Sequence, residues 1–162
     1  MSKKIVTCGI LSALAIIISS LERFIPLQSF IPLPGIKLGL SNCIILFLLL
    51  KSNPNQAFTV MSIKCIVVSM LFSGFSSFLY SYAGGLLSFF VMYLLSKNKY
   101  FTIYGISIAG AACHNIGQIA IASLLMQNEK IFIYLSPLIL VSIFTGIIVA
   151  LITIKLIERV KI

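Results

Sequence analysis

Long apolar stretches separated by short polar turns run through the whole chain. The stretches cover residues 5–21, 38–50, 56–72, 77–95, 101–126 and 131–157. An α-helix needs about 20 mostly apolar residues to cross a hydrocarbon core about 30 Å thick. Only 38–50 is clearly short for a full crossing, at a rise of about 1.5 Å per residue. The pattern predicts an all-α polytopic membrane protein, with six transmembrane helices in one bundle and a single domain over residues 1–162.

A proline-rich apolar segment joins the first two stretches. Residues 24–36 contain Pro26, Pro32 and Pro34 and close on Gly35. Prolines at this density are incompatible with a continuous helix. Because the other residues of the segment are mostly apolar, we expect this loop to fold back against the bundle or to lie at the membrane interface. Backbone at membrane depth is permitted only where protein covers it.

The composition excludes a soluble monomer. Of the 162 residues, 60% are hydrophobic and 9% are charged, and the mean hydropathy is +1.15. Soluble domains average about 45–50% apolar and about 25% charged residues. A chain of roughly 150 residues still leaves about 30% of its surface in water. Most of the surface of this chain must therefore face lipid.

The basic residues lie at the ends of the apolar stretches and are unevenly distributed. If the N-terminus is inside, the inner side carries Lys3, Lys4, Lys51, Lys97, Lys99, Lys155, Arg159 and Lys161. The outer side carries Arg23, Lys37 and Lys130, partly offset by Glu22 and Glu129. The positive-inside rule then predicts a multi-pass protein of the cytoplasmic membrane, with both termini in the cytoplasm and the first loop outside. The basic residues do not cluster as a nucleic-acid footprint would.

Several catalytic classes are excluded by missing residues. The chain has no aspartate, and its acids are Glu22, Glu129 and Glu158 against 12 lysines and arginines. The lack of aspartate excludes aspartate-rich magnesium sites and Ser-His-Asp triads. The P-loop motif, Gly-x-x-x-x-Gly-Lys-Ser/Thr, is also absent from the sequence. The four cysteines stand singly inside apolar stretches, which favours a packing role over a metal or redox site. We expect no enzyme activity, no cofactor and no metal.

Lys64 lies in the middle of an apolar stretch, between Ile63 and Cys65. A central lysine costs at least about 2.5–3.5 kcal/mol on insertion scales, and such residues usually face the bundle interior or a polar cavity. The alternative is that its long stem carries the ammonium to the inner membrane surface. The sequence leaves both interpretations open.

A polar cluster interrupts the fifth stretch. His114 and Gln118 are four residues apart and Asn115 and Gln118 three apart, so all three can share one helix face. One interpretation is polar contacts between helices, worth about 0.6–2 kcal/mol per bond. We favour the other, a binding cavity, because three strong hydrogen-bonding groups are concentrated beside small residues.

The predicted ligand site combines this cluster with Lys64 from the third stretch. The loop residues 34–37, with Gly35 and Lys37, are expected to cover it. Imidazole, amide and ammonium groups offer mostly donors, which suits a ligand that carries carbonyl or anionic oxygens. The surrounding Phe, Ile and Leu residues would accept an apolar ring or chain.

Small residues at four-residue spacing predict faces where helices pack closely. The fourth stretch has Ser77, Ser81, Gly84, Gly85 and Ser88, and the fifth has Gly105, Ala109, Cys113 and Gly117. We interpret them as packing positions inside one bundle. The alternative, a docking face for a second membrane protein, is kept for Gly9 and Ala13 in the first stretch.

Four motifs, in this order, resemble those of a bacterial membrane family. They are LERFIP at 21–26, PGIKLGLSN at 34–42, YAGGLLS at 82–88 and GAACHNIGQ at 110–118. The chain resembles heptaprenyl diphosphate synthase component I, also called the Gx transporter family, over nearly its whole length. That family is similar to the S components of energy-coupling factor transporters. The resemblance implies a six-helix protein that captures a vitamin-like or isoprenoid-related solute near the outer face, beneath its first loop.

The resemblance implies two different functions. An S component docks on a membrane coupling subunit with ATPases through an Ala-x-x-x-Ala pattern, for which this chain has Gly9 and Ala13. The alternative is a noncatalytic accessory subunit of heptaprenyl or polyprenyl diphosphate synthesis for quinone side chains, partnered by a soluble synthase. The chain cannot itself hold magnesium-bound diphosphates, because it lacks the carboxylates that magnesium prefers. A scaffold in a quinone or electron-transfer assembly is a third possibility.

Overall fold

The computed structural model describes residues 2–24, 37–72 and 74–160, with the backbone alone for residues 2–4 and 23. The helices are α1 (Ser2–Leu21), η1 (Glu22–Phe24), α2 (Asn42–Lys51), α3 (Pro54–Phe72), α4 (Gly74–Ser96), α5 (Ile103–Met126), η3 (Glu129–Tyr134) and α6 (Leu135–Arg159). Within these residues there are six α-helices and no strand, which confirms the prediction of an all-α protein.

Four helical segments are long and apolar enough to cross a membrane. They are α3, α4, α5 and the continuous segment Glu129–Arg159, which joins η3 to α6. The apolar part of α1, Ile5–Leu21, and the 10 residues of α2 are shorter. At about 1.5 Å per residue, α2 spans only about half of a 30 Å core. The structure thus supports four of the six predicted membrane crossings, and full crossings by α1 and α2 stay predictions.

The helix boundaries follow from local sequence signals. Gly39 has φ +79, a conformation that favours glycine, and it precedes the start of α2 at Asn42. This turn makes α2 shorter than the predicted stretch 38–50. At the start of α5, the Thr102 side chain accepts a hydrogen bond from the backbone N–H of Gly105, as an N-cap does. Pro137 lies in the first turn of α6, where a helix tolerates proline.

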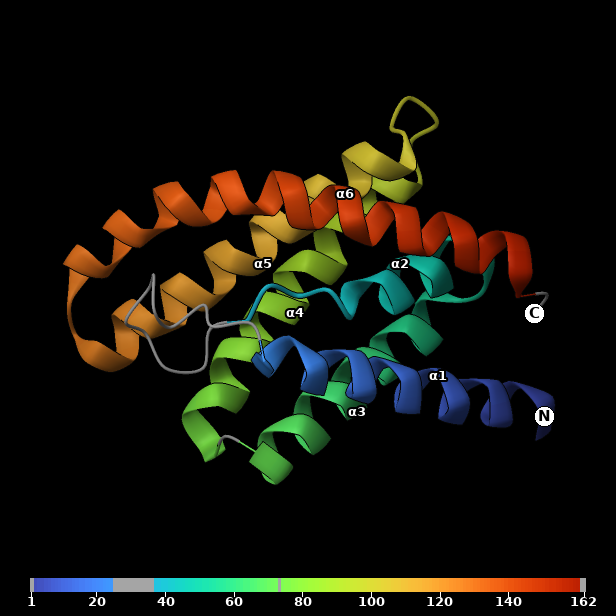
Figure 1. The fold of residues 1–162 in the computed structure, drawn as a ribbon, viewed down its shortest axis with the longest axis horizontal. Coiled ribbons are helices and arrows are strands. Elements are labelled where there is room, and N and C mark those ends of the chain that lie inside the picture. The colour runs from blue at the N-terminus through green and yellow to red at the C-terminus, as the bar shows by residue number, and fades with distance from the viewer. Residues whose placement is uncertain (1, 25–36, 73, 161–162) are drawn as a thin grey trace.

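In Figure 1, α2 lies between α1 and α6, in the half of the bundle that carries both termini. The most extensive contact is between α4 and α5, followed by α5 and α6, whereas α3 packs on α1, α2 and α4. All seven residues from Asn42 to Leu48 are buried, so α2 is enclosed on every side. A helix that is apolar all round is typical of such a position.

The small residues of α4 and α5 allow these two helices to approach closely. A Cβ added to Gly117 would lie 2.8 Å from the carbonyl oxygen of Ala83, and one added to Gly84 would lie 2.7 Å from that of His114. This close approach agrees with packing inside one bundle. In contrast, Gly9 and Ala13 are exposed on α1, and a Cβ on Gly9 would meet nothing within 4 Å.

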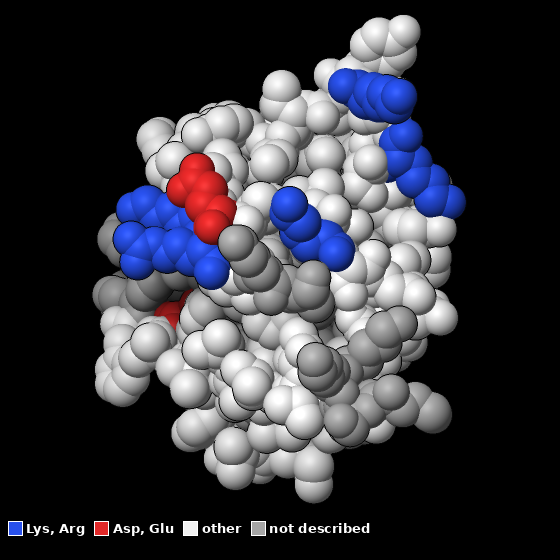
Figure 2. Space-filling view, turned by 90° about the vertical axis from the view of Figure 1, so that its right-hand side faces the viewer, with Lys and Arg blue, Asp and Glu red and all other residues white. Residues whose placement is uncertain are grey.

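Positive charge gathers at one end of the bundle. Figure 1 shows both termini, the α2–α3 turn and the α4–α5 turn at the same end, and Figure 2 shows lysine and arginine side chains around it. The exposed basic residues of these segments are Lys51, Lys97, Lys99, Lys155 and Arg159. The fold therefore brings together basic residues that are separated along the chain.

Candidate functional site

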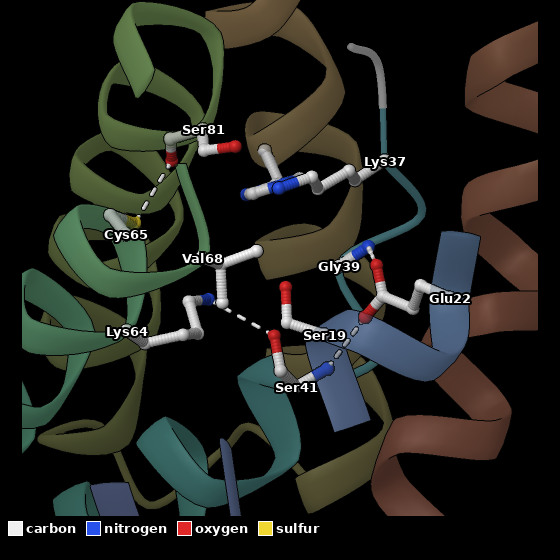
Figure 3. A pocket seen from close by; sticks show the side chains of 10 residues that line it. Ser19, Glu22, Lys37, Gly39, Ser41, Lys64, Cys65, Val68 and Ser81 are labelled. Atoms are coloured by element: carbon white, nitrogen blue, oxygen red, sulfur yellow. Dashed lines mark hydrogen bonds between the residues drawn. The ribbon is translucent and has the colours of Figure 1, made fainter. Parts of the chain in front are cut away.

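A small polar cavity lies inside the bundle between α1, α3, α4 and α5 (Figure 3). It is lined by Ser19, Glu22, Lys37, Gly39, Ser41, Lys64, Cys65, Val68, Ser81 and His114. The free space inside it is about 10 Å³, which is about the space that one water molecule needs. It is far smaller than the pockets of about 300–1,000 Å³ that hold drug-sized ligands.

Glu22 is a buried carboxylate at one side of the cavity. It follows the last residue of α1 and is 6% exposed. Its Oε2 accepts a hydrogen bond from the N–H of Gly39 at 3.1 Å, and its Oε1 accepts one from Ser41 at 2.9 Å. Burial raises the pKa of Glu22, opposed by these hydrogen bonds and by the positive charge of Lys64. Glu22 is thus not the outer-surface charge that the sequence predicted.

Lys64 points into the interior of the bundle and not to the membrane surface. It is 4% exposed, and its Nζ donates to the Ser41 hydroxyl at 3.1 Å and to Oδ1 of Asn42 at 3.4 Å. The amide of Asn42 donates in turn to the Ser88 hydroxyl of α4 at 3.2 Å. The interpretation that the Lys64 ammonium reaches the inner surface is therefore wrong.

His114 lines the cavity from α5 and is 2% exposed. Among the described residues, neither its Nδ1 nor the Ser81 hydroxyl has a hydrogen-bond partner. The buried serine hydroxyls of Ser12, Ser62, Ser69 and Ser77 also lack one, but they do not line this cavity. The imidazole lies close to Gly39, because a Cβ added there would be 3.0 Å from its Cδ2. A larger residue at position 39 would thus displace the ring.

Asn115 and Gln118 are buried beside the cavity but bind other parts of the protein. The Asn115 amide donates to the carbonyl of Leu138 at 3.2 Å and to the Ser142 hydroxyl at 2.9 Å, which joins α5 to α6. Gln118 pairs with the backbone of Lys37: its Oε1 accepts from the N–H and its Nε2 donates to the carbonyl, both at 2.8 Å. Both side chains therefore act as contacts between elements.

The structure brings together three of the six predicted ligand residues. Lys37, Lys64 and His114 line the cavity, whereas Asn115 and Gln118 do not. Gly35 lies outside the described residues, as do the neighbouring loop residues 34 and 36. A ligand role for any of them stays a prediction.

The other seven lining residues, among them Glu22, Ser41 and Ser81, were not predicted from the sequence. One signal was available for Glu22, because a lysine inside a membrane protein usually pairs with another charge or with backbone carbonyls. Glu22 is the acid that follows an apolar stretch and precedes the apolar loop. For Ser41 and Ser81 no such signal exists, since buried serines are common in helix interfaces.

Comparison with known proteins agrees with the motifs. No curated protein and no solved structure matches the chain. The family model described as heptaprenyl diphosphate synthase component I matches residues 11–156. That match extends from α1 to α6 and includes every described residue of the cavity lining. The chain therefore belongs to the heptaprenyl diphosphate synthase component I family.

Proposed function

We propose that this chain is a membrane-embedded solute-binding subunit, similar to the S components of energy-coupling factor transporters. In this proposal the cavity between α1, α3, α4 and α5 holds a polar group of a small vitamin-like or isoprenoid-related solute. The chain then delivers the solute to a separate membrane coupling subunit with ATPases.

The observation that carries this proposal is the pair of unpartnered polar atoms that line the cavity. The Nδ1 of His114 and the hydroxyl of Ser81 have no partner among the described residues. An unsatisfied buried donor or acceptor costs about 1–3 kcal/mol, and most buried polar groups in proteins are paired. Unlike the four unpaired serine hydroxyls elsewhere in the bundle, these two atoms line a cavity, where a bound group can satisfy them.

The charged groups favour binding over covalent chemistry. Both oxygens of Glu22 accept backbone hydrogen bonds, and Lys64 donates to Ser41 and Asn42. Groups held in this way position a ligand but are poorly placed to abstract or deliver a proton. Because the sequence also lacks a P-loop, uphill transport would need ATPases on other subunits. The exposed face of α1 around Gly9 and Ala13 is the surface proposed for docking.

A second candidate is a noncatalytic accessory subunit of polyprenyl diphosphate synthesis. The family description names a component I of a synthase, which implies a second component as partner. The lysines of the cavity suit a phosphorylated lipid as well as an anionic solute. In this alternative the chain receives or positions the product of a soluble synthase.

Two measurements on the protein extracted in mild detergent test the proposal. Native mass spectrometry should detect a small bound solute, and affinity capture should recover a coupling subunit with ATPases. Gly9→Leu should lose the coupling module but keep the solute, whereas Ser76→Leu, an exposed small-to-large change on α4, should keep both. Capture of a soluble prenyl diphosphate synthase in place of ATPases would favour the second candidate. Absence of any bound solute would overturn the proposal.

A further inference from the structure

We propose that the turn between α4 and α5 is a binding surface for the headgroup of an anionic phospholipid. The turn comprises residues 97–102 and joins two helices that are long and apolar enough to cross a membrane. It projects from the bundle at the end that carries both termini (Figure 1). This inference does not rest on the proposed function, because the turn is a different surface from the cavity.

The turn carries positive charge with no acidic residue beside it in the sequence. Residues 93–104 include Lys97 and Lys99 but no aspartate or glutamate. Both lysine side chains are exposed. A lysine close to a membrane surface strengthens attachment to anionic lipid by about fivefold. An anionic group at headgroup depth is therefore the partner whose charge complements this turn.

The ammonium of Lys97 is held in place by an aromatic side chain. Its Nζ lies 4.2 Å from the centroid of the Tyr93 ring, one turn earlier on α4. The Tyr93 ring stacks on Phe89, with 6.2 Å between the centroids, and Phe89 belongs to the buried core. The ring neutralises no charge, and N–H groups on the far side of the ammonium can donate to a phosphate. Because the lysine is already ordered, its binding to a phosphate costs less conformational entropy.

Hydrogen bonds of Asn98 fix the backbone of the turn. Its Oδ1 accepts from the N–H of Tyr100 at 3.1 Å, and its carbonyl oxygen accepts from the N–H of Phe101 at 3.3 Å. Lys99 lies between these bonded residues, so its backbone is fixed as well. The turn therefore presents both lysines from an ordered backbone.

Exposed apolar residues beside the lysines favour a lipid over an acidic protein surface as the partner. Tyr100 is 94% exposed and Phe101 is 45% exposed, and Leu94 on the last turns of α4 is 63% exposed. Tyrosine is enriched where a membrane meets water, because its ring lies at headgroup level. The lysines thus match the phosphate of a phospholipid, and the apolar side chains match the part of the lipid below it.

Tryptophan fluorescence in lipid bilayers tests this inference, because the chain has no tryptophan of its own. Tyr104→Trp places a single reporter in the first turn of α5, beside the turn. Lipids with brominated acyl chains quench this reporter when they bind next to it. In bilayers of phosphatidylcholine, brominated phosphatidylglycerol should bind there about twentyfold more tightly than brominated phosphatidylcholine, since two lysines contribute.

Four further variants of the reporter chain separate a local site from general surface charge. Lys97→Gln and Lys99→Gln should each lower the preference for phosphatidylglycerol about fivefold. Lys155→Gln, an exposed lysine of α6 at the same end of the bundle, is the matched control and should keep the preference. Tyr93→Leu should lower it about threefold, because Lys97 loses its ring while every charge stays.

The results expected for these variants would support the inference, and three results would overturn it. The first is equal binding of the two brominated lipids beside the reporter. The second is an equal loss in Lys97→Gln and Lys155→Gln, which would show attraction to the charged end as a whole. The third is the absence of a lipid preference together with an acidic protein that is captured by wild type but not by Lys97→Gln. None of these results depends on a solute in the cavity.

Discussion

At the residue scale, Ser41 links the two buried charges of the cavity. Its backbone N–H binds Glu22 and its hydroxyl binds Lys64, so the carboxylate and the ammonium stabilise one another across a single residue. Removal of either group leaves the other buried charge without this indirect partner, which destabilises the fold. Stability and ligand binding at this site therefore depend on the same atoms.

The buried carboxylate of Glu22 predicts a pH dependence of stability. Burial raises the pKa of Glu22 above its ordinary value of 4.5, so the folded chain holds this proton more tightly than the unfolded chain. The stabilisation is complete below about pH 4.5 and is lost as the pH rises through the folded-state pKa. Thermal unfolding in detergent should therefore show the melting temperature of wild type falling over this range.

Glu22→Gln supplies the comparison for this prediction, because glutamine does not titrate. The difference between the wild-type and Glu22→Gln melting temperatures should change with pH above 4.5, and Glu129→Gln, on exposed η3, should follow wild type. If the difference in melting temperature were constant from pH 4 to pH 9, Glu22 would have the same pKa in the folded and the unfolded chain, which would contradict the prediction.

Gly39 is predicted to be intolerant of a side chain for two reasons. Its φ of +79 strains other residues by about 1–2 kcal/mol, and an added Cβ would lie 3.0 Å from both His114 and Asn42. Gly74 also has a positive φ, of +71, but a Cβ added there would meet nothing within 4 Å. Gly74→Ala is therefore the control that measures the backbone strain alone. Gly39→Ala should lower the free energy of unfolding more than Gly74→Ala does. Equal losses in the two variants would mean that the contact with His114 costs nothing.

The sequence identifies polar residues inside apolar stretches, but it does not identify their hydrogen-bond partners in the fold. Lys64 and His114 were detectable because each interrupts an apolar stretch. Asn115 and Gln118 share the helix with His114, yet they bind α6 and the Lys37 backbone, which depends on the rotation of α5 within the bundle. Glu22 was assigned to the outer surface because it stands next to Arg23 in a polar pair, and only the fold encloses it.

At the element scale, the sequence predicts where the helices lie along the chain, but it does not predict which of them are enclosed by other helices. Apolar stretch length located all six helices, since each must satisfy its backbone hydrogen bonds internally. It could not show that α2 is short and enclosed on every side, because a buried helix and a membrane-facing helix have the same apolar composition. That difference is decided by the neighbours α3, α4 and α6.

The close contact between α4 and α5 predicts that Gly117 cannot be replaced by a larger residue without loss of stability. A Cβ there would lie 2.8 Å from the carbonyl oxygen of Ala83, which is backbone and cannot move aside alone. Overpacking of this kind costs about 1–3 kcal/mol, so Gly117→Ala should lower the melting temperature in detergent. Gly105→Ala, also on α5, should not lower it, because its nearest neighbour would be 3.7 Å away. Equal tolerance of both changes would show that the two helices separate readily.

At the scale of the whole molecule, the fold turns a scattered charge pattern into an asymmetric one. Lys51, Lys97, Lys99, Lys155 and Arg159 are far apart in the sequence, but they lie at the end that carries both termini (Figure 2). The described side chains of η3, at the other end of α5, include Lys130 and Glu129, whose charges offset each other. Because basic residues near helix ends favour the cytoplasmic side, this asymmetry supports the predicted orientation, with both termini in the cytoplasm.

The final prediction concerns this orientation. With the four native cysteines replaced by serine or alanine, a single Cys is placed at Asn55, in the first turn of α3, or at Glu129, at the start of η3. Both positions are exposed, and they lie at opposite ends of the bundle because the chain passes through three helices, α3, α4 and α5, between them. A membrane-impermeant maleimide added to intact cells should label Glu129→Cys and should reach Asn55→Cys only after the membrane is opened. Labelling of Asn55→Cys alone in intact cells would show that the topology is the inverse of the predicted one. It would also place the cavity, which lies near the end of α1 opposite the N-terminus, on the cytoplasmic side, where it could not receive a solute from outside.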